Sequence, residues 1–267
     1  MAGLSDLDRA AEFFRRYFRF GGTNPTLSRL LGDDELMEEW VQSLNKRLNT
    51  NPFEQTVEEQ LAALRKQNEL GNWGIGEDVF ERLLETAPAW PEGRDAHRSF
   101  LIRFGEGRDG VMQTFEAHAE AIKRVHTKFW RWDLLLSGAH PYQGNDVERL
   151  RLLNGNDTHH AVVEWIIIPD LSAHRKRESV TAVRDSKSLA DEGLVLAWLN
   201  PKRVEAIDYK QWCAWFCAGY ELNVPERDGE SWRHVVCVRR DLYDGTTSLS
   251  AHWRSDAGSY YSAPPVG

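Results

Sequence analysis

The first third of the chain repeats apolar residues at the three- and four-residue spacing of amphipathic helices. Helices are predicted to begin at Ser5, near Asp33, at Thr56 and at Glu77. The clearest of these starts is Thr56, because Glu59 follows three residues later and the two residue types form a capping box. We therefore expect a helical N-terminal region.

Two prolines and a glycine in residues 86–94 interrupt this helical pattern. A linker is predicted there. It divides the chain into a helical subdomain, residues 1–87, and a second domain, residues 88–267, in which the hydrophobic period changes.

The second domain mixes strand and helix patterns. Residues 111–136 predict one long helix, because their apolar positions are spaced alternately by four and three. Residues 161–168 are nearly all apolar and rich in β-branched side chains, as in a central strand, and residues 178–183 are expected to form its neighbour. Further elements are predicted as strands at 99–104 and 212–220, a helix at 189–199, and a hairpin of 235–239 with 248–253.

These elements predict an α+β fold. The helical N-terminal subdomain is followed by a mixed or antiparallel sheet that contains residues 161–168, and the long helix 111–136 packs on that sheet.

Composition limits the function classes. The formal net charge of −8 disfavours nucleic acid and anionic lipid unless a local basic face exists. The strongly apolar stretch 161–168 is far shorter than the roughly 20 residues of a membrane span, so no membrane partner is expected. The three cysteines all follow residue 212 and predict free thiols, and no secretory signal pattern is present. A soluble, cytoplasmic protein is predicted.

One set of residues indicates catalysis. Pro169 and Asp170 are followed by Asp185 and Lys187, a pattern similar to that of nucleases in which two carboxylates hold Mg²⁺ and a lysine polarises water. Glu164 is a further ligand in this hypothesis. It predicts a metal-dependent nuclease or phosphoesterase with Mg²⁺ as cofactor.

A glycine-rich motif of the phosphate-binding form, Gly105, Gly107 and Gly110, lies between a predicted strand and a predicted helix. Glu106 and Asp109 place negative charge where a phosphate would bind. The motif is therefore interpreted as a tight connection and no nucleotide cofactor is predicted.

A candidate zinc site is also interpreted as structural. Cys213, Cys217, His234 and Cys237 have ligand chemistry suited to zinc, but the spacing is that of small buried cysteines in strands. No metal site is predicted from them.

Three histidines could be either functional or structural residues. His118 is the polar member of an apolar helical stripe, so we expect a buried ring with a hydrogen bond to a backbone carbonyl, a hydroxyl or a carboxylate. The adjacent His159 and His160 are typical of exposed side chains or of an acid–base or metal site. The sequence leaves open whether these residues are functional or structural.

The 11 tryptophans favour a different class of function. Tryptophan is a frequent anchor of protein interfaces, and no convincing catalytic set accompanies these residues. The leading hypothesis is a binding or regulatory protein without catalytic activity, with a protein partner and no cofactor. The alternative is the Mg²⁺-dependent enzyme, for which nucleic acid is a substrate. A surface cluster of tryptophans favours the first, and convergence of the four site residues favours the second.

Several segments of the chain are similar to those of a known protein family. The chain contains R-S-F-L-I-R-F-G-E-G, K-F-W-R-W-D-L-L and G-N-D-T-H-H within residues 98–160. Over residues 90–260 it resembles an uncharacterised family from uncultivated bacteria with small genomes. The resemblance implies a bacterial, cytoplasmic protein and supports a boundary near Pro88, but it implies no chemistry.

Overall fold

The structure is a computed structural model, and it divides into two compact units, Met1–Thr50 and Asn51–Gly267. It describes residues 15–19, 21–135, 150–153, 159–173, 179–183, 187–223, 232–255 and 260–266. The division lies at residue 50, whereas the prolines of residues 86–94 predicted it near residue 88.

The first unit is helical in its described part. Helix α2 (Asn24–Leu31) begins at Thr23, whose hydroxyl accepts a hydrogen bond from the backbone of Thr26. Helix α3 (Asp34–Asn49) agrees with the helix predicted near Asp33, and the Asp33 carboxylate accepts a hydrogen bond from the third residue of that helix. The helix predicted from Ser5 begins outside the described residues, and residues 15–19 are helical.

Helices α4 (Val57–Gly71) and α5 (Glu77–Glu85) belong to the second unit. The capping box is confirmed, because the Thr56 hydroxyl accepts from the Glu59 backbone at 3.1 Å and the Glu59 carboxylate accepts from the Thr56 backbone at 2.8 Å. The apolar faces of α4 and α5 join the core of the second unit and contact α6, α8 and β4. This packing is the reason that the division between units does not follow α5.

The second unit contains two sheets. Strands β1 (His97–Arg103) and β4 (Val162–Ile168) make an antiparallel pair. A mixed sheet has the order β2-β7-β6-β5-β3, and β8 pairs with β5. Its strands are β2 (Phe129–Arg131), β3 (Leu150–Leu152), β5 (Ala214–Leu222), β6 (His234–Arg240), β7 (Thr247–Trp253) and β8 (Tyr261–Ser262). The predicted α+β class with a mixed sheet is confirmed.

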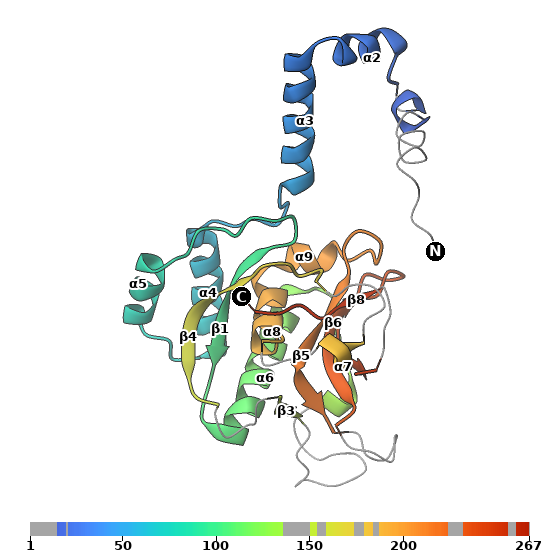
Figure 1. The fold of residues 1–267 in the computed structure, drawn as a ribbon. Helices are drawn as coiled ribbons and strands as arrows, with labels where there is room; N and C mark the ends of the chain where they lie inside the picture. Colours follow the sequence, from blue (N-terminus) through green and yellow to red (C-terminus); the bar gives the residue numbers. More distant parts are fainter. Residues whose placement is uncertain are drawn as a thin grey trace. The chain divides into compact units, whose positions relative to one another are not determined.

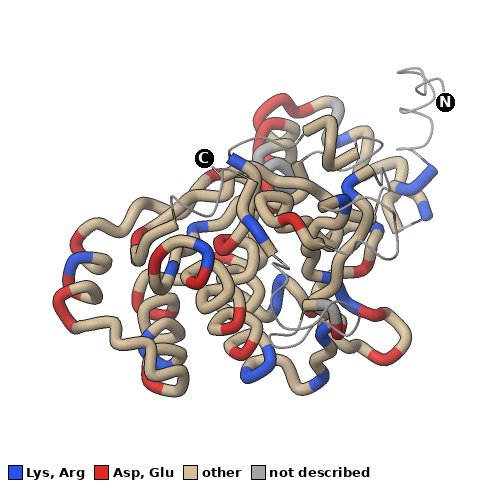
Figure 2. The backbone as a smooth tube through the Cα atoms, turned by 90° about the horizontal axis from the view of Figure 1, so that it is seen from below, with Lys and Arg blue, Asp and Glu red and all other residues tan. Residues whose placement is uncertain are grey.

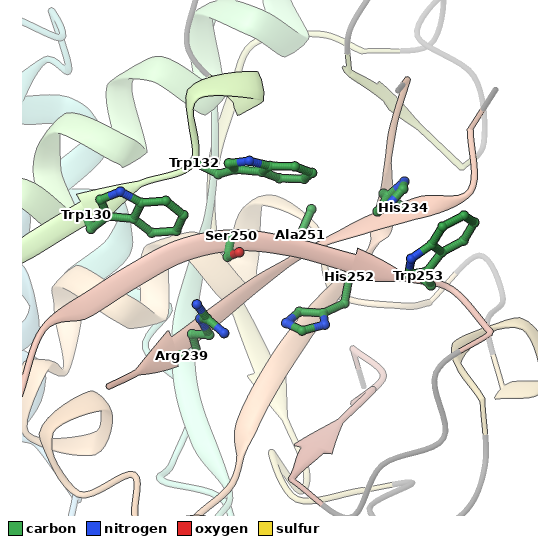
Figure 3. Close-up of a pocket in the computed structure, with 8 residues that line it drawn as sticks. All are labelled: Trp130, Trp132, His234, Arg239, Ser250, Ala251, His252 and Trp253. Carbon is green, nitrogen blue, oxygen red and sulfur yellow. The ribbon is translucent and has the colours of Figure 1, made fainter. Parts of the chain in front are cut away.

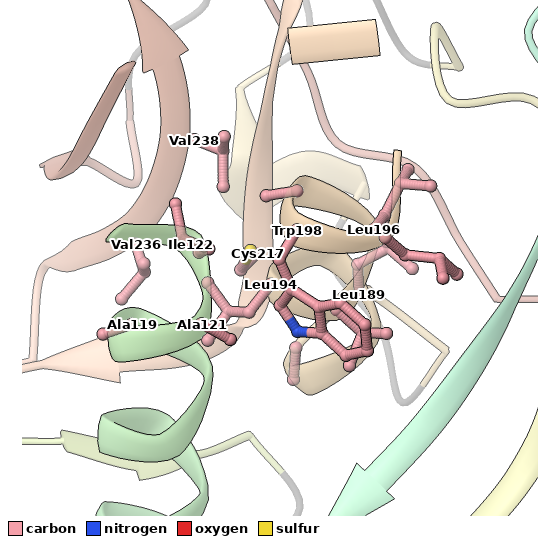
Figure 4. Close-up of a cluster of buried hydrophobic side chains, with 14 of the residues drawn as sticks. Ala119, Ala121, Ile122, Leu189, Leu194, Leu196, Trp198, Cys217, Val236 and Val238 are labelled. Carbon is pink, nitrogen blue, oxygen red and sulfur yellow. The ribbon is translucent and has the colours of Figure 1, made fainter. Parts of the chain in front are cut away.

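Helix α8 (Asp191–Leu199) lies between the two sheets and contacts β1 on one side and β5 on the other (Figure 1). All nine of its residues are buried, as its nearly continuous apolar sequence requires. Helix α6 (Gly107–Val125) packs beside α8 and contacts β1. Figure 4 shows the side chains of α8 meeting those of α6, β5 and β6 in one cluster. Shorter helices are α7 (Val180–Val183), α9 (Pro201–Glu205) and the 3-10 helix η1 (Asp133–Leu135).

Three predictions about this unit need correction. The helix predicted at 111–136 ends at Val125, because His126 has extended backbone and the next residues pair with β7 as strand β2. Residues 161–168 are confirmed as a strand, but this strand pairs with β1 rather than lying inside the large sheet. Residues 180–183 form helix α7, so the prediction of a strand at 178–183 is wrong for these residues.

His118 is buried inside α6 and has the partners that its position predicts. Its Nε2 lies 2.9 Å from the carbonyl oxygen of Ile102, and the indole N–H of Trp198 donates to Nδ1 at 3.4 Å. One nitrogen therefore donates and the other accepts, which defines a neutral imidazole. The backbone partner and the closed surroundings make His118 a structural residue.

Stability is expected to fall as the pH drops from 7.5 to 5. Burial lowers the pKa of His118, and burial also lowers the pKa of His97 and His126. Below the unfolded value of about 6.5 the unfolded chain binds more protons, so each such histidine costs up to about 1.4 kcal/mol per pH unit. Urea unfolding at three pH values measures this slope, and His118→Leu should reduce it. An identical slope in both proteins would contradict the assignment.

Candidate binding groove

An open groove with a volume of about 290 Å³ runs along the outer edge of β7 (Figure 3). We call it the tryptophan groove. Its lining is Trp130, Trp132, His234, Arg239, Ser250, Ala251, His252 and Trp253. These residues come from three strands of the mixed sheet and from the residue that follows β2.

The groove exists because β2 is shorter than its neighbour. Strand β2 pairs with β7 in parallel from Phe129 opposite Thr247 to Arg131 opposite Leu249. The backbone N–H of Trp132 then donates to the carbonyl of Leu249 at 3.0 Å, and the chain turns into η1. Beyond Leu249, no strand in the described part of the chain pairs with this side of β7.

Aromatic rings line the groove on both faces of β7. Trp130 lies opposite Ser248 in the register, on the face that also carries Arg239. Trp132, His234 and Trp253 form an aromatic wall on the other side. The ring centroids of His234 and Trp253 are 4.7 Å apart across the β6–β7 pair, and those of Trp132 and His234 are 6.0 Å apart. The side chains of Trp130 and Trp253 remain 42% and 38% exposed. Figure 3 shows Trp130 and Trp132 side by side along β7, with Trp253 and His234 farther along the strand. Large indole surfaces are therefore held in place while part of each stays open to solvent.

Polar and basic side chains form the other wall. Arg239, Ser250 and His252 share one face of the β6–β7 pair because they occupy alternate positions in its register. The Tyr261 hydroxyl lies 2.9 Å from Nε2 of His252 and also contacts Arg239. Burial raises the pKa of Tyr261 despite the nearby arginine, so this phenol stays neutral at physiological pH. The lining residues include a permanent cation and no carboxylate.

The four residues of the enzyme hypothesis do not form a described site. Glu164 is exposed on β4, and Asp170 is exposed beyond the end of that strand. Strand β4 stays extended from Glu164 to Ile168, a span of roughly 13 Å at about 3.3 Å per residue, and Asp170 follows after a bend at Pro169. The strand therefore carries Glu164 away from the end at which Asp170 lies.

For the other two members, the described residues show no metal site. Asp185 lies outside the described residues, and Lys187 accepts a backbone hydrogen bond from Val266 at 2.6 Å. Among the described His, Cys, Asp and Glu side chains, no group of three or more is placed to hold a metal ion. The hypothesis of a complete Mg²⁺ site stays a prediction without support from its described members.

The glycine-rich motif has a structural role. Gly105 and Gly107 have positive φ angles of 68° and 55°, and the N–H of Gly107 donates to the carbonyl of His159 at 2.8 Å. The His159 ring packs so closely on Gly110 that an added Cβ would lie 2.7 Å from Nδ1. The loop therefore holds the chain's own segment at His159, which is buried, whereas His160 is exposed.

The cysteines are free and buried, as predicted. Burial raises the pKa of Cys217 well above its usual value, which keeps this thiol protonated. These thiols belong to the core around β5 and β6.

A buried ion pair forms a second polar cluster. The Asp95 carboxylate accepts hydrogen bonds from Nε and Nη2 of Arg203 at 2.7 Å and 2.9 Å, from Nε2 of His97 at 3.1 Å and from the Ser172 hydroxyl at 2.5 Å. Arg203 is fully buried and lies over the ring of Trp215. This cluster is closed to solvent except near Ser172, so it stabilises the fold.

Sequence reasoning did not find the tryptophan groove. The helical spacing over residues 111–136 includes Trp132 and predicts a helix through Trp130, and Trp253 is predicted to lie in a hairpin strand. A tryptophan at every second position before a break in the helical pattern was the available signal, because side chains two apart in a strand share a face.

Charges of both signs are interspersed along the described backbone (Figure 2). The chain has a formal net charge of −8, whereas the residues that line the groove include Arg239 and no carboxylate.

Comparisons with protein-family models, with curated proteins and with solved structures found no match. Within the described ranges, none of the helices combines the length and apolar character that a bilayer crossing requires.

Proposed function

We propose that this chain is a binding protein that captures a polypeptide partner through the tryptophan groove. The observation that carries the proposal is the combination of Trp130, Trp132 and Trp253 around an open groove. Partly exposed tryptophans on a rigid sheet supply large contact area at a low cost in conformational entropy, which is why they act as interface anchors.

The competing enzyme hypothesis has weaker support. Glu164 lies on β4 and Asp170 lies beyond the end of that strand, and the groove lining contains no carboxylate to hold a metal ion. A binding or regulatory role agrees better with these features. The sequence resemblance implies that the protein is bacterial and cytoplasmic.

Selection from a displayed library of random dodecapeptides tests the proposal. Peptides enriched on the full-length protein should bind a Trp130→Ala/Trp253→Ala variant at least about tenfold more weakly, since each lost anchor removes more than about 1 kcal/mol of binding free energy. Fluorescence anisotropy of labelled peptides measures the affinities. Thermal unfolding of the variant verifies that it folds.

The matched control is Tyr243→Ala. Tyr243 is a fully exposed aromatic residue in the turn between β6 and β7, and it does not line the groove. The control should bind as the unaltered protein does. Failure to enrich any peptide, or equal binding by the double variant, would refute the proposed function.

A further inference from the structure

The outer edge of β7 presents backbone groups inside the tryptophan groove. Trp132 donates to the carbonyl of Leu249 on this side of the strand. Backbone groups of a strand point alternately to its two edges, so the N–H and C=O of Ala251 and Trp253 point the same way as those of Leu249. The groups of Ser250 and His252 point toward β6 instead.

These outward groups have no backbone partner in the described part of the chain. The pairing of β2 ends before Ala251, and no other described segment hydrogen-bonds to Ala251 or Trp253 from this side. The Ala251 methyl group packs against the core, which anchors the strand while its edge stays open. An open edge flanked by side-chain pockets is the arrangement that binds a peptide as an added strand.

The two walls of the groove define the side chains that such a peptide requires. His234 and Trp253 lie on the face of the β6–β7 pair that also carries Ala251, whereas Arg239 and His252 lie on the opposite face. An added strand directs successive side chains to alternate faces. Apolar residues would meet the aromatic wall, and acidic residues would meet the basic wall.

We propose that the tryptophan groove binds an extended segment of a partner protein in which apolar and acidic residues alternate, and that this segment pairs with β7 at Ala251 and Trp253. The inference rests on the proposed function and specifies the ligand. Single-stranded nucleic acid also stacks on tryptophan. It has no peptide backbone whose N–H and C=O groups could pair with a strand edge, and the negative charge of the chain opposes it.

The test uses a capped seven-residue peptide of alternating valine and glutamate, titrated into the full-length protein by calorimetry. Two further peptides carry N-methyl groups, one on the valines and one on the glutamates. Only one of these sets can face β7, because adjacent residues direct their N–H groups to opposite edges. One N-methylated peptide should bind about tenfold more weakly or worse, through lost hydrogen bonds, and the other should bind nearly as well as the parent.

A lysine-for-glutamate peptide and a protein variant complete the experiment. The lysine peptide should bind more weakly, with a difference that shrinks at high salt. Ala251→Pro removes an N–H to which no described segment hydrogen-bonds, so the protein should fold and lose the peptide, whereas Tyr243→Ala should retain it. If Ala251→Pro does not fold, the N-methylated pair decides the outcome alone.

Three results would overturn the inference. These are no binding of the valine–glutamate peptide, equal effects of the two N-methylated peptides, and displacement of the peptide by oligothymidylate. If library peptides still depend on Trp130 and Trp253 in these cases, the proposed function stands and only strand addition is lost. If no library peptide binds, the proposed function itself has failed.

Discussion

Asp95→Asn is expected to lower the free energy of unfolding by about 3–5 kcal/mol, because it leaves a buried guanidinium without its anion. Arg203 is fully buried and makes two hydrogen bonds to the Asp95 carboxylate. The uncharged amide presents only one acceptor, and its NH₂ group faces the donors that the carboxylate accepted. Urea unfolding followed by circular dichroism measures the difference.

An exposed ion pair supplies the control. The side chains of Arg65 and Glu77 are 49% and 66% exposed, so Glu77→Gln should change the free energy of unfolding by less than about 1 kcal/mol. Equal effects of Asp95→Asn and Glu77→Gln would contradict the role given to the buried pair.

The pH dependence of the Asp95→Asn effect has a definite sign. Burial alone would raise the pKa of Asp95, but hydrogen bonds from His97 and Arg203 and their charges outweigh burial and hold it well below its usual value. The contribution of the carboxylate is therefore complete above the unfolded value of about 3.9 and is lost as the pH falls below it. The difference between the two proteins should be full at pH 7 and should shrink below pH 4.

Elements that depend on local interactions were predictable from the sequence. Helix α4 begins where Thr56 and Glu59 form their capping box, and α5 spans the residues expected for it. The β6–β7 hairpin turns at Asp244 and Gly245, where glycine adopts a positive φ of 77°. In each case the deciding contacts lie within a few residues.

Elements that depend on distant partners were not predictable. The helical spacing of apolar residues continues past Val125, but Phe129 to Arg131 pair with β7, which follows more than a hundred residues later. Tertiary pairing therefore overrides the local pattern. The tryptophan groove has the same origin, because it requires both the early end of β2 and the register of β7. Similarly, Glu164 and Asp170 are close in sequence, but Glu164 lies within β4 and Asp170 follows the bend after that strand.

Trp198→Ala is the second large effect that we expect. Trp198 is buried in α8, its indole N–H donates to His118, and its ring centroid lies 5.8 Å from that of Trp73. Removing a buried tryptophan loses its apolar contacts and leaves a cavity, which costs about 3–5 kcal/mol. Trp198→Phe fills much of that space but leaves Nδ1 of His118 without its donor, so we expect an intermediate loss of about 1–3 kcal/mol.

The same substitution at Trp130 separates stability from binding. Trp130 is 42% exposed in the groove, so Trp130→Ala should lower the free energy of unfolding by less than about 1.5 kcal/mol, because much of the indole is already in water. Trp198→Ala should unfold at a much lower urea concentration, whereas Trp130→Ala should stay folded and lose affinity for library peptides. If both variants lose equal stability, Trp130 is a core residue, and an indole that the fold requires cannot serve as an open anchor for a partner.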